Sequence, residues 1–292
     1  MFCLISKRTP LRWLFNCVVA CFCLNASPAW ATLHVIYPRM DERAADDYGF
    51  KVLELALSKS GIPYSLTVSK LKMNQERAGS MLEQGVISVW DAGASAELET
   101  RYKAVNFPID RGLSGYRLFL INKEQLGDFA KIRTLGALKN KRAGQGPGWG
   151  DTKILNGAGI HVRTAEFEPL FRLLNAKRID FFPLGAEEIF TLLERHRGAS
   201  PDLVVEPDLA LHYPFARLFF VRKGNMRLHD AIHSGLVNAF ADGSFQRLLE
   251  SDKKFHDGVS RAKLRTRTIF MLDNANLTRA FRLMPKEYFY TP

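Results

Sequence analysis

The sequence predicts an α/β protein built from two lobes. Two observations favour this fold class. Short apolar runs alternate with amphipathic helical segments, which is the pattern of strands linked by helices. The alternation begins after residue 32 and begins again near residue 115, with no floppy linker between the two units. Such units predict lobes joined by extended crossing segments, with a cleft for a small ligand between them.

The first unit reads as strand, helix, strand, helix and strand, an order typical of a largely parallel sheet. Gly61 and Gly85 are the stop signals of its two helices. The expected strands are 32–38, 64–69 and 86–93, and the expected helices are 47–61 and 74–85.

The second unit repeats the alternation. Pro169 in the first turn and Gly198 at the end delimit two of its helices. The expected strands are 115–122, 160–165 and 179–183, and the expected helices are 134–141, 168–178 and 186–198. Residues 203–224 lead from this unit to a last helix, in which Leu228, Ile232, Leu236 and Phe240 form one apolar stripe.

The chain is expected to cross between the lobes twice, within residues 111–121 and 206–220. The last helix then returns to the first lobe. This organisation gives lobe 1 as residues 32–115 with 213–251, lobe 2 as 116–212, and a C-terminal extension, 252–292, that packs on lobe 1.

Residues 1–31 have the pattern of a secretory signal. Three basic residues precede an apolar run, and an Ala-x-Ala site predicts cleavage after Ala31. A lipoprotein site ending at Cys21 is the competing interpretation. All four cysteines lie before residue 24, so the exported chain lacks thiols, which suits an oxidising compartment such as a periplasm. No later stretch is long enough to span a membrane, so no span is expected after signal removal.

The net charge and the distribution of basic residues limit the classes of binding partner that we expect. Removing the signal lowers the formal net charge from +11 to +8. This charge is compatible with simple solubility or with an anionic small ligand. No dense block of lysine and arginine interleaved with aromatic residues is present, so nucleic acid is not an expected partner.

Four segments, in this order, resemble the periplasmic solute-binding proteins of family 3, the amino-acid type with the two-lobed type II architecture. They are LETRYKAVNFPI (98–109), NKRAGQGPGWGDT (140–152), LFRLLNAKRIDFFP (170–183) and FVRKGN with LHDAIHSGLVNAFADGSF (220–245). The chain is most similar to a proteobacterial subgroup of exported binding-protein homologues. The resemblance implies a small-molecule ligand in the inter-lobe cleft, and an inner-membrane transporter or a sensor as partner.

Arg101 is the leading ligand-binding candidate. In the resembling family, the arginine of this segment faces the cleft from lobe 1 and binds the ligand carboxylate, for which a guanidinium offers two parallel donors. The alternative is a surface arginine paired with Glu97 or Glu99.

The glycine-rich turn before a lobe 2 helix supplies four further candidates: Trp149, Gly150, Asp151 and Thr152. Unpaired backbone N–H groups at a helix start favour an anion. In this interpretation Thr152 adds a hydroxyl and Trp149 an apolar wall. In the other interpretation, the segment is a tight turn in which Asp151 or Thr152 merely caps the helix.

The remaining candidates are aromatic, basic or acidic residues at expected cleft edges. Trp90 ends a strand and Tyr37 follows the first strand; each could line the cleft or belong to the core, and Arg39 could contact the ligand or solvent. The aspartate with which family members hold a ligand ammonium falls on or near Gly185, so an ordinary α-amino acid is doubtful as the ligand. Glu188 is the nearby candidate ammonium partner, although acidic residues are also favoured at a helix start.

No catalytic constellation is expected. The nucleophile-elbow and metalloprotease motifs are absent, and His229 and His233 lack a third metal ligand. We therefore expect a binding protein with no metal and no cofactor, and keep a dehydratase-like enzyme or a partner-binding signalling protein as alternatives.

Overall fold

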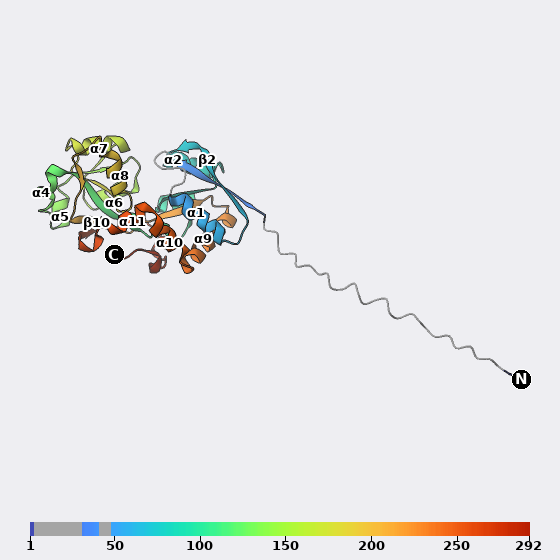
Figure 1. Ribbon diagram of the computed structural model, residues 1–292. Coiled ribbons are helices and arrows are strands. Elements are labelled where there is room, and N and C mark those ends of the chain that lie inside the picture. The colour runs from blue at the N-terminus through green and yellow to red at the C-terminus, as the bar shows by residue number, and fades with distance from the viewer. Residues whose placement is uncertain (3–30, 41–47) are drawn as a thin grey trace. The chain divides into compact units, whose positions relative to one another are not determined.

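The computed structural model describes residues 1–2, 31–40 and 48–292. Nearly all of the predicted signal, with the alternative lipoprotein residue Cys21, lies outside the described residues. Residues Met1–Ala31 and Thr32–Pro292 are separate units. The fold described here is that of the second unit (Figure 1).

Five strands form the first strand group. β1 and β2 pair in parallel, and β11 lies antiparallel between β3 and β4. The Ser88 N–H donates to the Ile36 carbonyl at 2.9 Å, which brings the start of β3 beside β1. The strands are β1 (Leu33–Met40), β2 (Tyr64–Met73), β3 (Val89–Gly93), β4 (Lys103–Val105) and β11 (Arg217–Val221), and the helices are α1 (Tyr48–Lys59), α2 (Gln75–Glu83), α3 (Ala96–Arg101) and α9 (Met226–Ala241).

The second strand group is built around β5. β8 pairs with one side of β5, and β9 and β10 pair with the other, all antiparallel. β6 and β7 pair in parallel, and Ala143 of β6 bridges Phe181 beside β8. The strands are β5 (Tyr116–Asn122), β6 (Ala143–Gln145), β7 (Val162–Thr164), β8 (Phe182–Gly185), β9 (Leu203–Val205) and β10 (Leu209–His212), and the helices are α4 (Leu126–Phe129), α5 (Leu135–Leu138), α6 (Gly150–Gly157), α7 (Phe167–Asn175) and α8 (Ile189–His196).

The alternation of strands and helices is confirmed, but the sheets are mixed rather than largely parallel. β5 and β11 are the first strands to follow each crossing, and both run antiparallel to their neighbours. In Figure 1, α4 to α8 lie together in one half of the fold, and α1, α2 and α9 lie in the other.

The chain passes between the two groups at Asn106–Gly115, before β5, and at Tyr213–Ala216, before β11. Buried Asp110 ties these crossings together, because its carboxylate accepts from Gly112 N at 3.0 Å, from the Ser114 hydroxyl and from Arg217 N at 3.1 Å. Gly112 has a φ of +72°, which glycine adopts without strain.

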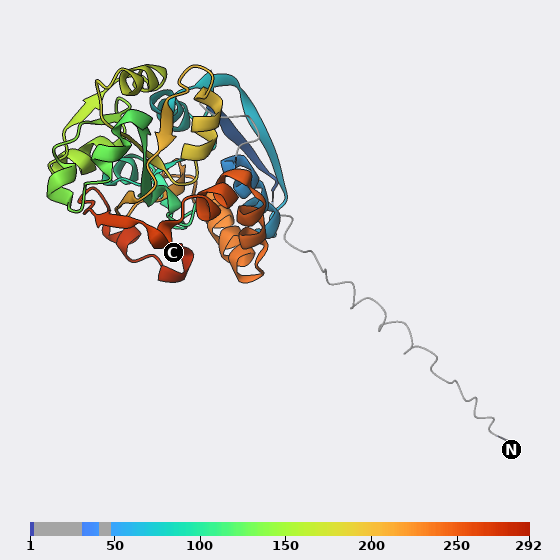
Figure 2. The ribbon, with the colours of Figure 1, turned by 60° about the vertical axis from the view of Figure 1, so that its left-hand side comes forward.

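The C-terminal segment, which the sequence predicts to pack on lobe 1, contacts both strand groups. Its β12 pairs in parallel with β10 and so extends the second group, while Leu277, Phe281 and Met284 pack beside Trp90 of the first group. Figure 2 shows this red segment along one side of the fold. Its elements are α11 (Lys253–Ser260), β12 (Thr268–Met271) and α12 (Arg279–Arg282), which follow α10 (Ser244–Ser251).

Helices α1 and α9 pack closely because Gly235 faces the backbone of Ala56. A Cβ added at Gly235 would lie 2.6 Å from the Ala56 carbonyl carbon and closer still to its oxygen. Leu228, Ile232 and Leu236 of α9 are buried beside this contact, which confirms the predicted stripe.

We expect Gly235→Ala to lower the free energy of unfolding by about 1–3 kcal/mol, because the new methyl group must push the two helices apart. Urea unfolding followed by circular dichroism measures the change. Ser234→Ala, on the same helix, is the matched control, and we expect it to stay within about 0.5 kcal/mol of the wild type. Equal stabilities of the two variants would contradict the close packing.

Among the helices of the described residues, none combines the length and the apolar character that a membrane span needs.

Candidate functional site

Two groups of charged side chains lie at the ends of the strands near the crossings. In the first strand group, Asp91 of β3 is fully buried. Its carboxylate accepts from the Tyr37 hydroxyl and from the Arg217 guanidinium, with Arg217 Nε at 3.0 Å. Because β11 is antiparallel to β3, Arg217 stands opposite Gly93, at the carboxyl end of β3. We call Tyr37, Asp91 and Arg217 the Asp91 cluster.

The second group, in the second strand group, is centred on Arg117 of β5, which is buried. Arg117 Nη2 lies 2.7 Å from Asp151 Oδ1, and Arg117 Nε donates to the Tyr213 hydroxyl at 2.8 Å. The Tyr213 hydroxyl in turn donates to Asp151. Arg117 Nη1 lies 3.8 Å from Glu188 Oε1. Together with Glu187, these four residues form what we call the Arg117 cluster.

The ionisation of these buried groups follows from their contacts. Burial alone lowers the pKa of Arg117, but the Asp151 carboxylate and the Tyr213 hydroxyl outweigh it and raise that pKa above the usual range. Burial also raises the pKa of Tyr213 well above its ordinary value. Arg117 is therefore charged and Tyr213 is neutral, as a hydroxyl that donates to Asp151 must be.

Glu187 lies over Gly185, on or near which the resemblance to family 3 places an aspartate. A Cβ built on Gly185 would lie 2.5 Å from Glu187 Oε2 and 2.6 Å from Oε1, so the Glu187 carboxylate covers the side-chain face of residue 185. Glu187 is 8% exposed, and within the described part of the chain its Oε2 has no hydrogen-bond partner. Burial, followed by the negative charge of Glu188, raises the pKa of Glu187 to about 8.

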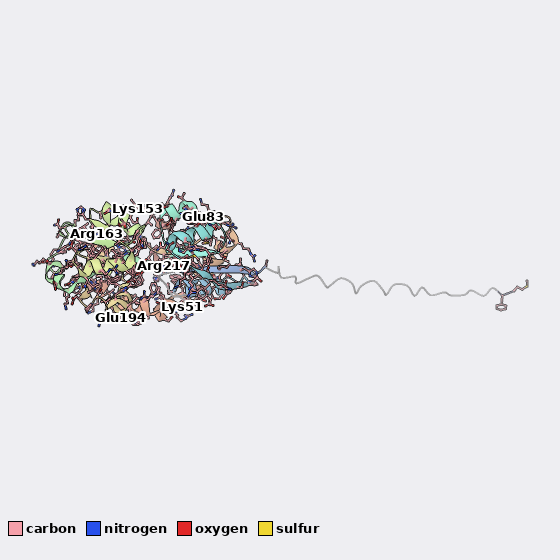
Figure 3. The ribbon with its side chains drawn as sticks, turned by 90° about the horizontal axis from the view of Figure 1, so that it is seen from above. Lys51, Glu83, Lys153, Arg163, Glu194 and Arg217 are labelled. Carbon is pink, nitrogen blue, oxygen red and sulfur yellow. The ribbon has the colours of Figure 1, made fainter. Side chains whose placement is uncertain are left out.

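The two clusters are linked through the crossings. The Arg117 guanidinium lies over the Phe215 ring at 5.2 Å, and a Cβ on Gly93 would lie 2.9 Å from Cε2 of that ring. Phe215 therefore separates the Arg117 cluster from the end of β3 that holds the Asp91 cluster. Figure 3 shows Arg217 between the half that carries Lys153 and Arg163 and the half that carries Lys51 and Glu83.

An exposed ion pair joins α6 to α3. Lys153 Nζ lies 3.5 Å from Glu97 Oε2, and both side chains are about two-thirds exposed, at 68% and 66%. An ion pair so open to solvent contributes little, about 0–1 kcal/mol. It nevertheless marks where the first turns of α6 and α3 face each other.

Arg101, the leading candidate from the sequence, belongs to neither cluster. It is exposed at the end of α3, and its Nε and Nη2 atoms donate to Glu83 Oε1 of α2 at 3.1 and 3.0 Å. The alternative of a surface arginine describes this position, although the partner is Glu83 rather than Glu97 or Glu99. The guanidinium is held on the outside of α2 and α3 in this structure.

The glycine-rich turn does begin a helix. Gly150, Asp151 and Thr152 form the first turn of α6, and Asp151 carries its charge into the Arg117 cluster rather than capping the helix. The Thr152 hydroxyl is buried and has no hydrogen-bond partner in the part of the chain that is described. Trp149 stacks on Phe182 with ring centroids 6.2 Å apart, so much of its ring belongs to the core.

The other candidates separate into buried and exposed residues. Trp90 packs in the core against Tyr102 and Phe220, and Tyr37 is buried within the Asp91 cluster. Arg39 is exposed on β1. Glu188 lies at the start of α8, and its Oε1 accepts from Gly185 N at 3.1 Å.

Sequence reasoning missed Asp91, Arg117, Tyr213, Phe215 and Arg217. Arg117 and Arg217 lie at the start of apolar strands, Asp91 lies within β3, and Tyr213 and Phe215 lie in a crossing. The charged residues interrupt the apolar pattern of these strands, and that interruption is the signal that could have found them. Within residues 31–40 and 48–292, no three histidine, cysteine or acidic side chains gather as a metal site would require.

Comparison with known proteins decides the fold. No family profile and no curated protein matches this chain. An ancestral arginine-binding protein bound to arginine matches 76% of this chain and 98% of its own, with a TM-score of 0.55 at 18% identity. The substrate-binding protein of an amino acid ABC transporter matches 77% of this chain and 100% of its own, with a TM-score of 0.53 at 13% identity.

The chain has the fold of the two-lobed periplasmic solute-binding proteins. A histidine kinase sensor domain with similarity to periplasmic binding proteins shares it, with a TM-score of 0.54 at 14% identity over 75% of this chain and 93% of its own. In such folds, ligands bind beyond the carboxyl ends of parallel strands. Arg217 stands opposite Gly93 at the carboxyl end of β3, and Arg117 stands opposite Gly185 at the carboxyl end of β8, although both of these pairings are antiparallel.

Proposed function

We propose that the exported chain is a periplasmic solute-binding protein that holds a small polar molecule between the Asp91 cluster and the Arg117 cluster. Lobe 1 is then residues 32–115 with 213–251, and lobe 2 is residues 116–212. The fold, the strand-end position of both clusters and the aromatic ring of Phe215 between them support this assignment. The ligand would be passed to an inner-membrane transporter or reported to a sensor.

The observation that carries the proposal is the Glu187 carboxylate over Gly185, because one of its buried oxygens lacks a donor. A buried acceptor without a donor costs about 1–3 kcal/mol, and a ligand amine would relieve that cost. The ligand carboxylate would lie at the first turn of α6, where the Thr152 hydroxyl lacks a partner and space around Gly150 is open. We infer a ligand that carries both an acidic and a basic group.

The first experiment is mass spectrometry of the small molecules released when freshly purified protein is denatured. A compound with an acidic and a basic group in stoichiometric amount is the expected result. Calorimetric titration of the stripped protein with that compound then gives its Kd. If the stripped protein binds neither this compound nor any amino acid, diamine or carboxylate, the proposal fails.

Two variants test the placement of the ligand. Thr152→Val and Glu187→Gln should each weaken binding about 10- to 100-fold, as expected for the loss of one hydrogen bond to a charged group. Arg101→Ala is the informative comparison. The sequence predicts that it abolishes binding, whereas the Glu83 contact predicts an unchanged Kd. Loss of binding in Arg101→Ala alone would move the site to α3.

One observation favours a second function. With a pKa of about 8 when no cation is beside it, Glu187 is protonated at neutral pH in the empty site and so is able to donate a proton to a leaving group, whereas a bound amine would favour its ionised form. A dehydratase-like elimination on a bound hydroxy acid is the reaction class that fits such a group. Consumption of the co-purified compound, followed by mass spectrometry over time, supports this alternative; an unchanged compound excludes it.

A further inference from the structure

The C-terminal segment, residues 252–292, is attached to the first strand group. The centroid of the Phe255 ring lies 4.1 Å from that of the Tyr48 ring at the start of α1. Farther along, Asn276 O accepts from Ala96 N at 2.8 Å, and the Thr278 hydroxyl donates to Glu99 on α3 at 2.7 Å. Three apolar side chains of the segment are buried beside Trp90: Leu277, Phe281 and Met284.

The same segment is attached to the second strand group. Four residue pairs join β12 to β10, from Leu209 and Thr268 to His212 and Met271. Directly after α11, Arg261 Nη1 lies 2.7 Å from Glu194 Oε1 of α8. A Cβ on Gly258 would lie 2.8 Å from Glu187 Cα, so α11 also packs against the strand end that carries the Arg117 cluster.

Between these attachments, the segment binds both crossings. Asn274, which is buried, donates through Nδ2 to Pro214 O at 3.0 Å. At the first crossing, Tyr290 N donates to Arg111 O at 2.7 Å, and the Phe289 ring lies against Gly112.

The Arg111 guanidinium holds the last residues of the chain. It donates to the carbonyl oxygens of Glu287 at 3.0 Å, Phe289 at 3.2 Å and Tyr288 at 3.4 Å. The Tyr288 ring then packs on Phe107 and Phe240 of the first strand group, with centroids 4.6 and 4.9 Å away.

We propose that residues 252–292 act as a strap that joins the two lobes and limits their movement about the crossings. Two-lobed binding folds close when a few crossing residues change their backbone angles. Here the crossing residues Arg111, Gly112 and Pro214 are held by the strap, which is a third connection between the lobes and is attached to both strand groups. Movement of one lobe against the other therefore requires the strap to slide or to release contacts on at least one side.

The strap also gives a role to the apolar side chains of the C-terminal segment. One continuous buried cluster contains side chains of both strand groups together with Phe255, Ala262 and Leu264. Tightly packed contacts of this kind do not deform gradually, so the strap favours a small number of defined lobe positions.

The test is a distance distribution between spin labels at Lys51→Cys and Arg163→Cys, one exposed position in each half (Figure 3). The four natural cysteines, all before residue 24, are replaced by serine. Arg111→Met removes the guanidinium that holds the chain end but keeps its apolar stem. A second variant ends after Met284. The expected result in both is a wider distribution, or a second distance, without added ligand.

Arg265→Ala is the matched control, since Arg265 is an exposed arginine of the same segment; its distribution should equal that of the wild type. Circular dichroism and Tm confirm that each variant folds, and if the shortened chain does not fold, Arg111→Met decides. Folded variants with the wild-type distribution would overturn the strap. Because the measurement needs no ligand, its outcome is separate from that of the proposed function.

Discussion

Replacing Arg117 by methionine should lower the free energy of unfolding by about 3–5 kcal/mol, which is the cost of removing one partner from a buried ion pair. The guanidinium is buried, and it compensates Asp151 at 2.7 Å while donating to Tyr213 at 2.8 Å. Without it, the Asp151 carboxylate remains buried with the Tyr213 hydroxyl as a donor but with no cation beside it. Urea unfolding at neutral pH measures the loss.

The double variant Arg117→Met/Asp151→Leu separates the ion pair from the packing around it. Removing both charges leaves no uncompensated ion, so we expect the double variant to recover most of the lost stability. Arg101→Met is the matched control, because the Arg101–Glu83 pair is exposed and should contribute less than about 1 kcal/mol. A double variant no more stable than Arg117→Met would show that the charges of this cluster are not coupled.

The elements of the fold could be predicted because their signals are local. The helix at Met226–Ala241 has its apolar residues on one stripe and an Asn225 cap, and both are visible in the sequence. The pairing of the strands is not local. Whether β11 runs parallel or antiparallel to β3 depends on how the chain crosses at Tyr213–Ala216, which the apolar pattern of a single strand does not record.

The candidate site was harder to predict because it depends on contacts between distant residues. Arg101 matched a family segment, but a local match cannot show that Glu83 of the preceding helix binds its guanidinium. Gly185 looked like a missing carboxylate, and only the folded backbone shows that Glu187 turns back over it. Asp151 was predicted from its position at a helix start, yet its partner Arg117 lies 34 positions earlier in the sequence.

The acidic and basic side chains of the two clusters are not equal in number. Asp91 and Asp151 each have an arginine beside them. Glu187 is acted on by the negative charges of Glu188 and Asp110 and by the positive charge of Arg117. The site therefore has more carboxylates than cations. A ligand with a basic group completes this balance, which connects the electrostatics to the proposed function.

Stability should consequently depend on pH through Glu187. Its pKa in the folded protein is about 8, compared with about 4.3 for an ordinary glutamate. Between these values the folded state keeps a proton that the unfolded state releases, so the free energy of unfolding should fall as pH rises, by up to about 1.4 kcal/mol per pH unit. The groups that face Glu187 are Arg117 of β5, Asp110 of the crossing and adjacent Glu188, while α11 packs there through Gly258.

Glu187→Gln removes this ionisation and should flatten that part of the pH dependence. Urea unfolding of the variant and the wild type from pH 5 to pH 8 is the measurement, and the stability difference in favour of the variant should grow with pH, reaching about 2–4 kcal/mol at the upper end. Glu54→Gln, an exposed position on α1, should leave the wild-type slope unchanged. Parallel curves for Glu187→Gln and the wild type would mean that Glu187 ionises in the folded protein as it does in the unfolded chain. Glu187 would then carry a negative charge at neutral pH.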